Sequence, residues 1–246
     1  MKKALIVGGS NGIGLSIALQ LQGYDRITII DKAEPAQPLP PHIEYVLFDL
    51  TSADYSIFDR YQDVSLLMIT AGFGHLALFR DITEQHIIDS FQVNSIAAIR
   101  IIKHFYERLS GADDFLCGIM VSIAGFLSSP LFAVYGATKA ALKIFIESVN
   151  VELEMGGSRN RILNVSPGSI RGTRFDGGTN DLSQTKALAQ QIIEHLEAKK
   201  DLFIPQYEEV YQHVLERYHQ DFRAEGRHSY EYKMKSGRVK AVPSTT

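Results

Sequence analysis

Residues 4–14 read Ala-Leu-Ile-Val-Gly-Gly-Ser-Asn-Gly-Ile-Gly, an apolar run that passes directly into a glycine-rich turn. Gly8 permits a tight turn after a strand, Gly12 lets the backbone approach a pyrophosphate, and Gly14 lets the following helix pack closely on a sheet. Amide groups at the start of that helix then face the phosphates. A merely structural turn is the alternative. The predicted cofactor contacts in this stretch are Gly8, Ser10, Asn11, Gly12, Ile13 and Gly14.

Short apolar runs rich in Ile, Val and Leu recur along the chain without polar alternation, which is typical of strands covered on both faces. The predicted strands are Ala4–Val7, Ile27–Ile30, Tyr45–Phe48, Leu66–Ile69, Gly118–Val121, Ile162–Val165 and a short Leu202–Pro205. The predicted helices are Gly12–Gln22, Glu84–Leu109, Ala133–Met155 and Thr185–Lys199. This order predicts an α/β, Rossmann-like doubly wound fold, with a seven-stranded, mostly parallel sheet and helices on both faces.

No linker divides the chain, so we predict a single catalytic domain over residues 1–206. Residues 207–246 are predicted to be an appended helix, ending near Arg223, followed by a basic tail. The crossover Lys32–His42 holds four prolines, which exclude a regular helix and predict an extended loop.

Composition narrows the function classes. With 246 residues, 45% of them hydrophobic, and a net charge of -3, the chain gives no reason to expect nucleic acid or a membrane as partner. Cys117 is the single cysteine and cannot form an internal disulfide. The eight histidines show no metal-ligand spacing, so no metal is predicted. Because the N-terminal apolar run is too short for a signal core, a cytoplasmic location is expected.

Acidic residues follow the second and third predicted strands. Asp31 is placed to accept hydrogen bonds from ribose hydroxyls and to repel a 2′-phosphate, which favours NAD(H) over NADP(H). The cation of Lys32, beside Asp31, weakens this preference for NAD(H). The alternative role for Asp31 is to cap a loop. Asp49, with Leu50, is a further predicted cofactor contact near the adenine, although Asp49 could equally be a turn residue.

Tyr135 and Lys139 are four residues apart on a predicted helix, so both side chains can reach one cleft. A nearby ammonium is expected to lower the pKa of the phenol from about 10 and so suit it to proton exchange with an alcohol or carbonyl. Ser122 ends the preceding strand and can donate to a carbonyl oxygen. Asn94 is polar within an apolar helical stretch; it either distorts the helix and holds a water beside Lys139, or is a buried, self-bonded Asn.

Together these motifs resemble the short-chain dehydrogenase/reductase family over about residues 3–205. The family's glycine turn matches Gly8, Gly12 and Gly14, and its segment after the sixth strand matches residues 164–168, which read Asn-Val-Ser-Pro-Gly. Its catalytic residues match Asn94, Ser122, Tyr135 and Lys139.

The resemblance implies further cofactor contacts. Lys139 is expected to bind the nicotinamide ribose as well as to act in catalysis. The remaining expected contacts around the nicotinamide are Ala71, Gly72, Pro167, Gly168, Ile170 and Thr173. By the same resemblance, the helices Glu84–Leu109 and Ala133–Met155 are expected to pair with a second copy, giving a homodimer or homotetramer.

The chain also departs from the family's pattern. Val7 replaces the usual Thr before the first glycine, and Ile69-Thr70 replace two Asn that brace the central sheet, so bracing must be done otherwise. The Thr of the nicotinamide segment appears one place late, as Thr173.

The function predicted is NAD-dependent oxidoreduction, a reversible hydride transfer between NAD(H) and a small-molecule secondary alcohol or ketone. The first alternative is a non-catalytic NAD-sensing or scaffold protein. The second alternative is an enzyme that uses the cofactor for dehydration or epimerisation. An apolar substrate pocket is expected, with Asp176-Gly177-Gly178 as the hinge of a lid and Arg171 and Arg174 as candidate anion ligands or solvated surface residues. Its predicted walls are Gly125–Phe132, Phe73–Phe79 and Arg174–Ser183.

Overall fold

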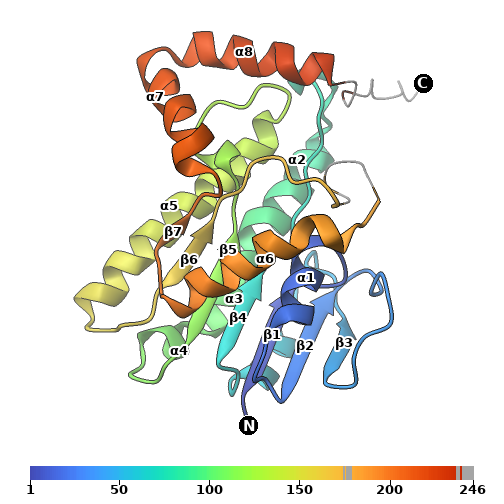
Figure 1. Ribbon diagram of the computed structural model, residues 1–246, viewed down its shortest axis with the longest axis vertical. Helices are drawn as coiled ribbons and strands as arrows, with labels where there is room; N and C mark the ends of the chain where they lie inside the picture. The colour runs from blue at the N-terminus through green and yellow to red at the C-terminus, as the bar shows by residue number, and fades with distance from the viewer. Residues whose placement is uncertain (174, 176–178, 237–238, 240–246) are drawn as a thin grey trace.

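The computed structural model describes residues 1–173, 175, 179–236 and 239. Its centre is a seven-stranded sheet in the order β3-β2-β1-β4-β5-β6-β7, and every neighbouring pair is parallel (Figure 1). This confirms the predicted doubly wound fold, with all rather than most of the strands parallel. The strands are β1 (Lys3–Val7), β2 (Arg26–Asp31), β3 (Ile43–Leu47), β4 (Leu66–Ile69), β5 (Leu116–Met120), β6 (Ile162–Val165) and β7 (Leu202–Phe203).

Helices cover both faces of the sheet. The α-helices are α1 (Gly12–Gln20), α2 (Glu84–Phe91), α3 (Ala97–His104), α4 (Tyr106–Ser110), α5 (Ala133–Met155), α6 (Leu182–Glu197), α7 (Gln212–Gln220) and α8 (Phe222–Lys235). Two π-helical segments are η3 (Gln92–Ile96) and η6 (Tyr207–Tyr211), and the short 3-10 segments are η1 (Ser56–Tyr61), η2 (Phe79–Asp81) and η4 (Ile123–Gly125). The proline-rich segment 32–42 is a loop without a helix, as predicted.

Two hydrophobic layers hold the helices to the sheet. Successive residues of a strand point to opposite faces, so Leu5 of β1 joins the layer under α3 and α5 while Ile6 joins the layer under α1 and α6. Each layer is continuous across several strands, and both β1 side chains are fully buried. Burial on both faces explains why the strands read as unbroken apolar runs.

The predicted helix Glu84–Leu109 is wrong as a single element. The chain forms α2, a π-helical turn at η3, then α3, and breaks at Phe105 (φ -101°, ψ 9°) before α4. Asn94 lies in the π-helical turn, and its buried amide bonds a neighbouring loop rather than solvent. Wider turns of this kind commonly mark functional positions.

The C-terminal prediction also needs correction, because the part expected to be a basic tail is largely helical. The chain turns at Asp221 (φ -149°, ψ 93°) between α7 and α8. The Asp221 carboxylate accepts hydrogen bonds from the backbone N–H groups of Arg223 and Ala224, at 2.9 and 3.0 Å. An N-cap of this type starts a new helix, so α8 continues to Lys235.

Apolar side chains stay exposed on one side of the helical layer. Ile88 of α2, Ile96 of η3, and Ile144 and Val151 of α5 are each at least 43% exposed. Assembly with a second copy through these helices stays a prediction. Within the part of the chain that the structure describes, no helix has both the length and the apolar character needed to cross a bilayer.

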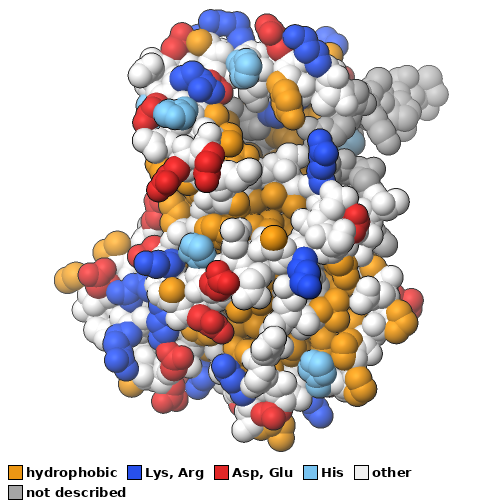
Figure 2. Space-filling view, viewed as in Figure 1, with side chains coloured by type: hydrophobic (Ala, Val, Ile, Leu, Met, Phe, Trp, Pro, Cys, Tyr) orange, Lys and Arg blue, Asp and Glu red, His pale blue; other side chains and the backbone are white. Residues whose placement is uncertain are grey.

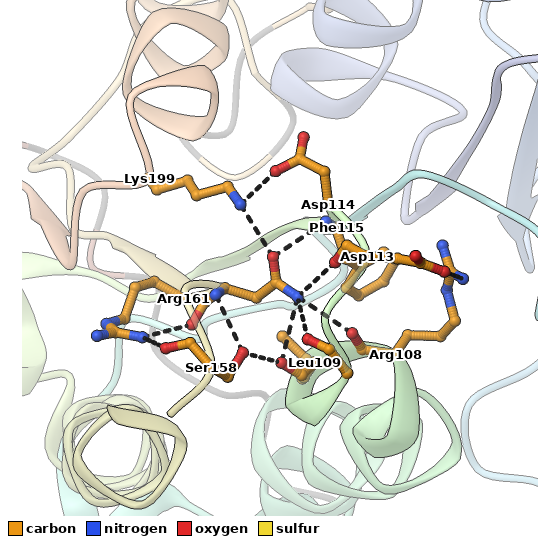
Figure 3. Close-up of polar contacts among 10 residues, drawn as sticks. Arg108, Leu109, Asp113, Asp114, Phe115, Ser158, Arg161 and Lys199 are labelled. Atoms are coloured by element: carbon orange, nitrogen blue, oxygen red, sulfur yellow. Dashed lines mark hydrogen bonds and ion pairs between the residues drawn. The ribbon is translucent and has the colours of Figure 1, made fainter. Parts of the chain in front are cut away.

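A buried asparagine ties together the loops at the amino-terminal edge of the sheet (Figure 3). Asn160 Oδ1 accepts from Phe115 N at 3.1 Å and from Lys199 Nζ at 2.9 Å. Its Nδ2 donates to backbone carbonyl groups after α4, including that of Asp113 at 2.9 Å. One side chain therefore joins the starts of β5 and β6 and the end of α6.

We expect Asn160→Ala to lower the free energy of unfolding by about 2–3 kcal/mol, because buried backbone groups lose their partners. Urea unfolding measures this change. The exposed Gln190→Ala, which removes one hydrogen bond to Glu194 on the surface of α6, should change stability by less than about 0.5 kcal/mol. Equal losses in the two variants would contradict the role given to Asn160.

Candidate active site

A cleft of about 850 Å³ lies along the carboxyl-terminal edge of the sheet. Ligands of doubly wound folds bind at this edge. The structure brings to the cleft all the sequence-predicted site residues except Ser10 and Asn94, which lie behind its wall. The predicted residues lining it are Gly8, Asn11, Gly12, Ile13, Gly14, Asp31, Asp49, Leu50, Ala71, Gly72, Ser122, Tyr135, Lys139, Pro167, Gly168, Ile170 and Thr173.

The turn between β1 and α1 has the backbone geometry that its glycines predicted. Gly8 has φ +89° and Gly12 has φ +54°, and a Cβ at Gly8 would overlap the backbone of Ala71. The first amide of α1, Gly12 N, donates to Asn180 Oδ1 at 2.6 Å. The amide oxygen of Asn180 thus stands where a phosphate oxygen would bind a helix N-terminus.

Thr70 is a site residue that sequence reasoning missed. Its Oγ1 donates toward the carbonyl oxygens of Val7 at 3.2 Å and Gly8 at 2.9 Å. A Cβ at Gly14 would collide with the same hydroxyl. Thr70 therefore joins β4 to the glycine turn, and it braces the sheet where the family usually has an Asn pair. The signal in the sequence was a Thr at a position where the family usually has Asn.

Asp31 ends β2 and lines the cleft. Its Oδ2 accepts from Ser10 Oγ at 2.6 Å and Ser10 N at 3.1 Å, and its Oδ1 accepts from Ala33 N at 3.2 Å. Ser10 thus orients the carboxylate instead of lining the cleft. Asp49 is exposed, and its Oδ1 accepts from Thr51 N and Oγ1, both at 2.9 Å, which is the turn role left open for it. These hydrogen bonds lower the pKa of Asp49.

Tyr135 and Lys139 both extend from α5 into the cleft. Lys139 is buried and donates from Nζ to the carbonyl oxygen of Met120, at the end of β5, at 2.8 Å. Burial lowers the pKa of Lys139 to about 7. Burial also raises the pKa of Tyr135 to about 12, and a hydrogen bond with Ser122 opposes that rise. The predicted lowering of the Tyr135 pKa by Lys139 is therefore wrong for this state, because burial disfavours the charged form of both groups.

Ser122 follows β5 and is held by the neighbouring loops. Its Oγ accepts from Ala124 N at 3.1 Å and donates to the carbonyl oxygen of Pro167 at 3.4 Å. The hydroxyl is thereby placed between the loop after β5, the loop after β6, and Tyr135. Two hydroxyl groups that meet in a cleft can together hold a carbonyl oxygen.

Asn94 acts behind this site. Its Oδ1 accepts from Phe73 N at 2.9 Å, and its Nδ2 donates to Phe73 O at 2.8 Å and to Thr138 Oγ1 at 3.3 Å. A Cβ on Gly72 would lie 3.2 Å from Asn94 Oδ1 and 3.3 Å from Lys139 Nζ, so both groups flank that glycine. Asn94 fixes the loop after β4 against α5 beside Lys139.

Two aromatic side chains pack beside the ring of Tyr135. The Phe132 and Phe175 rings lie 5.3 and 5.1 Å from the Tyr135 ring and 6.1 Å from one another, centre to centre. They give the apolar wall that the sequence predicted. The proposed hinge residues 176–178 and Arg174 lie outside the described residues.

The fold and the site together define a doubly wound α/β protein with Ser, Tyr and Lys at one cleft. A family model described as short chain dehydrogenase matches residues 2–184. The chain therefore belongs to the short-chain dehydrogenase/reductase family.

Relatives in sequence agree with this. A short-chain dehydrogenase/reductase of Claviceps purpurea is 28% identical over 184 residues, which are 69% of this chain and 62% of the relative. An uncharacterized oxidoreductase of Saccharomyces cerevisiae, TDA5, is 30% identical over 185 residues, or 70% of this chain and 56% of the relative. In both cases the match spans less than two thirds of the relative.

Solved structures show the same fold. A short-chain dehydrogenase from Streptomyces avermitilis superposes with a TM-score of 0.74 at 22% identity, covering 96% of this chain and 100% of that protein. A short-chain dehydrogenase from Burkholderia cenocepacia, in complex with NADP, gives a TM-score of 0.70 at 20% identity, with coverages of 88% and 98%.

The burial of Lys139 predicts a pH dependence of stability. The folded protein releases the Lys139 proton near pH 7, whereas the unfolded chain keeps it up to the ordinary value of 10.5. The unfolded state thus binds more protons between these values, so the contribution of Lys139 to the free energy of unfolding rises with pH in this window.

We therefore expect the stability of the wild type relative to Lys139→Met to rise from about pH 7 to about pH 10. Urea unfolding across this range measures the difference. The exposed Lys186→Met on α6 serves as control, and its difference from wild type should stay flat. A flat difference for Lys139→Met as well would count against a neutral, buried amine.

Proposed function

We propose that the protein catalyses reversible hydride transfer between NAD(H) and a secondary alcohol or ketone. The observation that carries the proposal is the meeting of Ser122, Tyr135 and Lys139 at one cleft, below the glycine turn of a dinucleotide site. A purely NAD-sensing protein would have no need of hydroxyl groups placed for proton transfer.

The residues present fit a dinucleotide. The N-terminus of α1 at Gly12 suits the phosphates, Asp31 suits a ribose, and residues 167–173 suit the nicotinamide end. A cofactor phosphate would take over the Gly12 amide from Asn180. When bound, the nicotinamide supplies or accepts the hydride.

Proton transfer falls to the protein's own residues. With a pKa near 12, Tyr135 is protonated at neutral pH and can donate from its hydroxyl to the oxygen of a ketone being reduced. Ser122 can donate a hydrogen bond to the same oxygen and hold it in place. With a pKa near 7, Lys139 populates both amine and ammonium near neutrality, so it can replenish the proton within the buried site.

Asp31 supports NAD(H) as the cofactor. Ser10 and Ala33 fix the carboxylate with three hydrogen bonds, so it has no freedom to turn away from a ribose 2′ position. A 2′-phosphate there would meet an oriented negative charge at short range. Lys32 also lines the cleft and works against this preference.

We expect NAD and NADH to raise the melting temperature more than NADP and NADPH at equal concentration. A cofactor at about a hundredfold over its Kd adds about 2.7 kcal/mol of stability. In Asp31→Ser the gap between the two cofactor types should shrink, whereas the exposed Asp113→Ser should leave it unchanged. A larger shift with the phosphorylated cofactors in the wild type would overturn the assignment of NAD(H).

Tyr135→Phe should lower ketone-dependent NADH oxidation by about 10²- to 10⁴-fold, because the proton donor is lost. Its melting shift with NADH should match that of the wild type, because the aromatic ring remains. Tyr218→Phe on α7 is the matched control and should retain turnover. Wild-type protein that binds NADH yet oxidises it with no ketone in a broad panel would favour the NAD-sensing alternative.

A further inference from the structure

The two C-terminal helices form a wall of the cleft. Helices α7 and α8 lie over the carboxyl edge of the sheet, and Figure 2 shows them as a lobe with hydrophobic side chains exposed below it (Figures 1 and 2). They fall beyond the family-matched residues 2–184. The cleft residues that they and η6 supply include Tyr211, Val214, Ser229 and Tyr232. This part of the site therefore lies outside the residues that the family model matches.

The wall is docked on the loop between Ser122 and α5. The buried Lys233 donates from Nζ to Ser129 Oγ at 2.7 Å and to the carbonyl oxygen of Pro130 at 2.8 Å. A Cβ on Gly226 would lie 3.3 Å from Ser128 Oγ, so α8 packs tightly against the same loop. The helices thus hold a defined position relative to the catalytic hydroxyl groups.

The buried charged groups of the wall serve this docking. Lys233 is bonded to the loop below it, and the buried Glu225 accepts from Arg217 Nε at 2.7 Å and Nη2 at 3.3 Å. His228 also lines the cleft but is exposed to solvent. Beside these groups, the wall presents the neutral hydroxyl groups of Tyr211, Ser229 and Tyr232 to the cleft.

Tyr211 lies against the loop that follows β6. Its phenol fills the space over Gly168: a Cβ there would overlap the hydroxyl oxygen and lie 2.7 Å from ring carbon Cζ. Gly168 follows Pro167, whose carbonyl oxygen accepts from Ser122 Oγ at 3.4 Å and from Ile123 N at 3.0 Å. The Ser122 hydrogen bond and the Tyr211 contact thus fall on consecutive residues.

Among the described residues, none accepts a hydrogen bond from the Tyr211 hydroxyl. Burial raises the pKa of Tyr211, which keeps its proton at neutral pH. The same cleft is lined by Leu127, Phe132 and Phe175, and the two Phe rings stack at 27°. A substrate in the cleft therefore meets aromatic surface as well as a phenol donor.

We propose that Tyr211 determines substrate specificity by donating a hydrogen bond to a second, uncharged oxygen of a ring-containing ketone or alcohol, remote from the carbon that reacts beside Ser122 and Tyr135. The inference rests on the proposed function, because the reacting oxygen is assigned to Ser122 and Tyr135. It narrows the substrate to cyclic compounds that carry a hydroxyl or second carbonyl group.

The test compares 2-tetralone with 6-hydroxy-2-tetralone, which differ by one oxygen at the far end of the ring system. Calorimetry measures the binding of each to Tyr135→Phe saturated with NADH, so that no turnover disturbs the measurement. The hydroxylated ketone should bind about fivefold more tightly, as expected for one neutral hydrogen bond. Adding Tyr211→Phe should abolish this preference, whereas adding Tyr218→Phe should preserve it.

The inference is overturned by equal affinities in the Tyr135→Phe protein, by a preference that survives Tyr211→Phe, or by failure of both ketones to bind. NADH affinity and melting temperature of each variant confirm that it is folded. With Tyr135 intact, Tyr211→Phe should raise the KM for the hydroxylated ketone and leave kcat nearly unchanged, as for an interaction equal in ground and transition states. If the wild type bound the ketones but oxidised no NADH, the proposal of hydride transfer would be contradicted. The proposed role of Tyr211 in binding would not be.

Discussion

At the end of β1 the chain comes so close to β4 that only glycine fits at position 8. A Cβ there would overlap Ala71, and the positive φ of Gly8 excludes most other residues as well. Thr70 secures this approach by donating to the carbonyl groups of Val7 and Gly8. The start of α1, the loop after β4 and, through Gly72, the position of Lys139 all depend on that contact.

Burial decides the electrostatics of the site. Tyr135 and Lys139 favour their neutral forms for the same reason, although their pKa values move in opposite directions. A protonated phenol beside a partly protonated amine is suited to donating a proton to a carbonyl group that is being reduced. The Met120 carbonyl oxygen holds the amine at the end of β5, and Asn94 keeps the neighbouring loop in place. The proposed proton transfer therefore depends on side chains of α5 that are held in place by the end of β5 and by Asn94 of η3.

The family-matched core and the C-terminal helices supply different residues to the cleft. Residues 2–184, which match the family, carry the glycine turn and the three groups proposed for proton transfer. The C-terminal elements η6, α7 and α8 line another part of the cleft, and Tyr211 of η6 lies against Gly168. The two relatives in sequence match about 70% of this chain and extend beyond the matched part.

The sequence by itself was enough to predict the alternation of strands and helices, the parallel sheet and the edge where Gly8, Asp31, Ser122 and Tyr135 gather. These features follow from local periodicity and from the rule that parallel strands place their carboxyl ends together. Only the tertiary structure decided the π-helical turn at Asn94, the N-cap that turns the basic tail into α8, and the burial that raises the Tyr135 pKa. Each of these depends on contacts between residues far apart in the chain, and such contacts leave no periodic signal in the sequence.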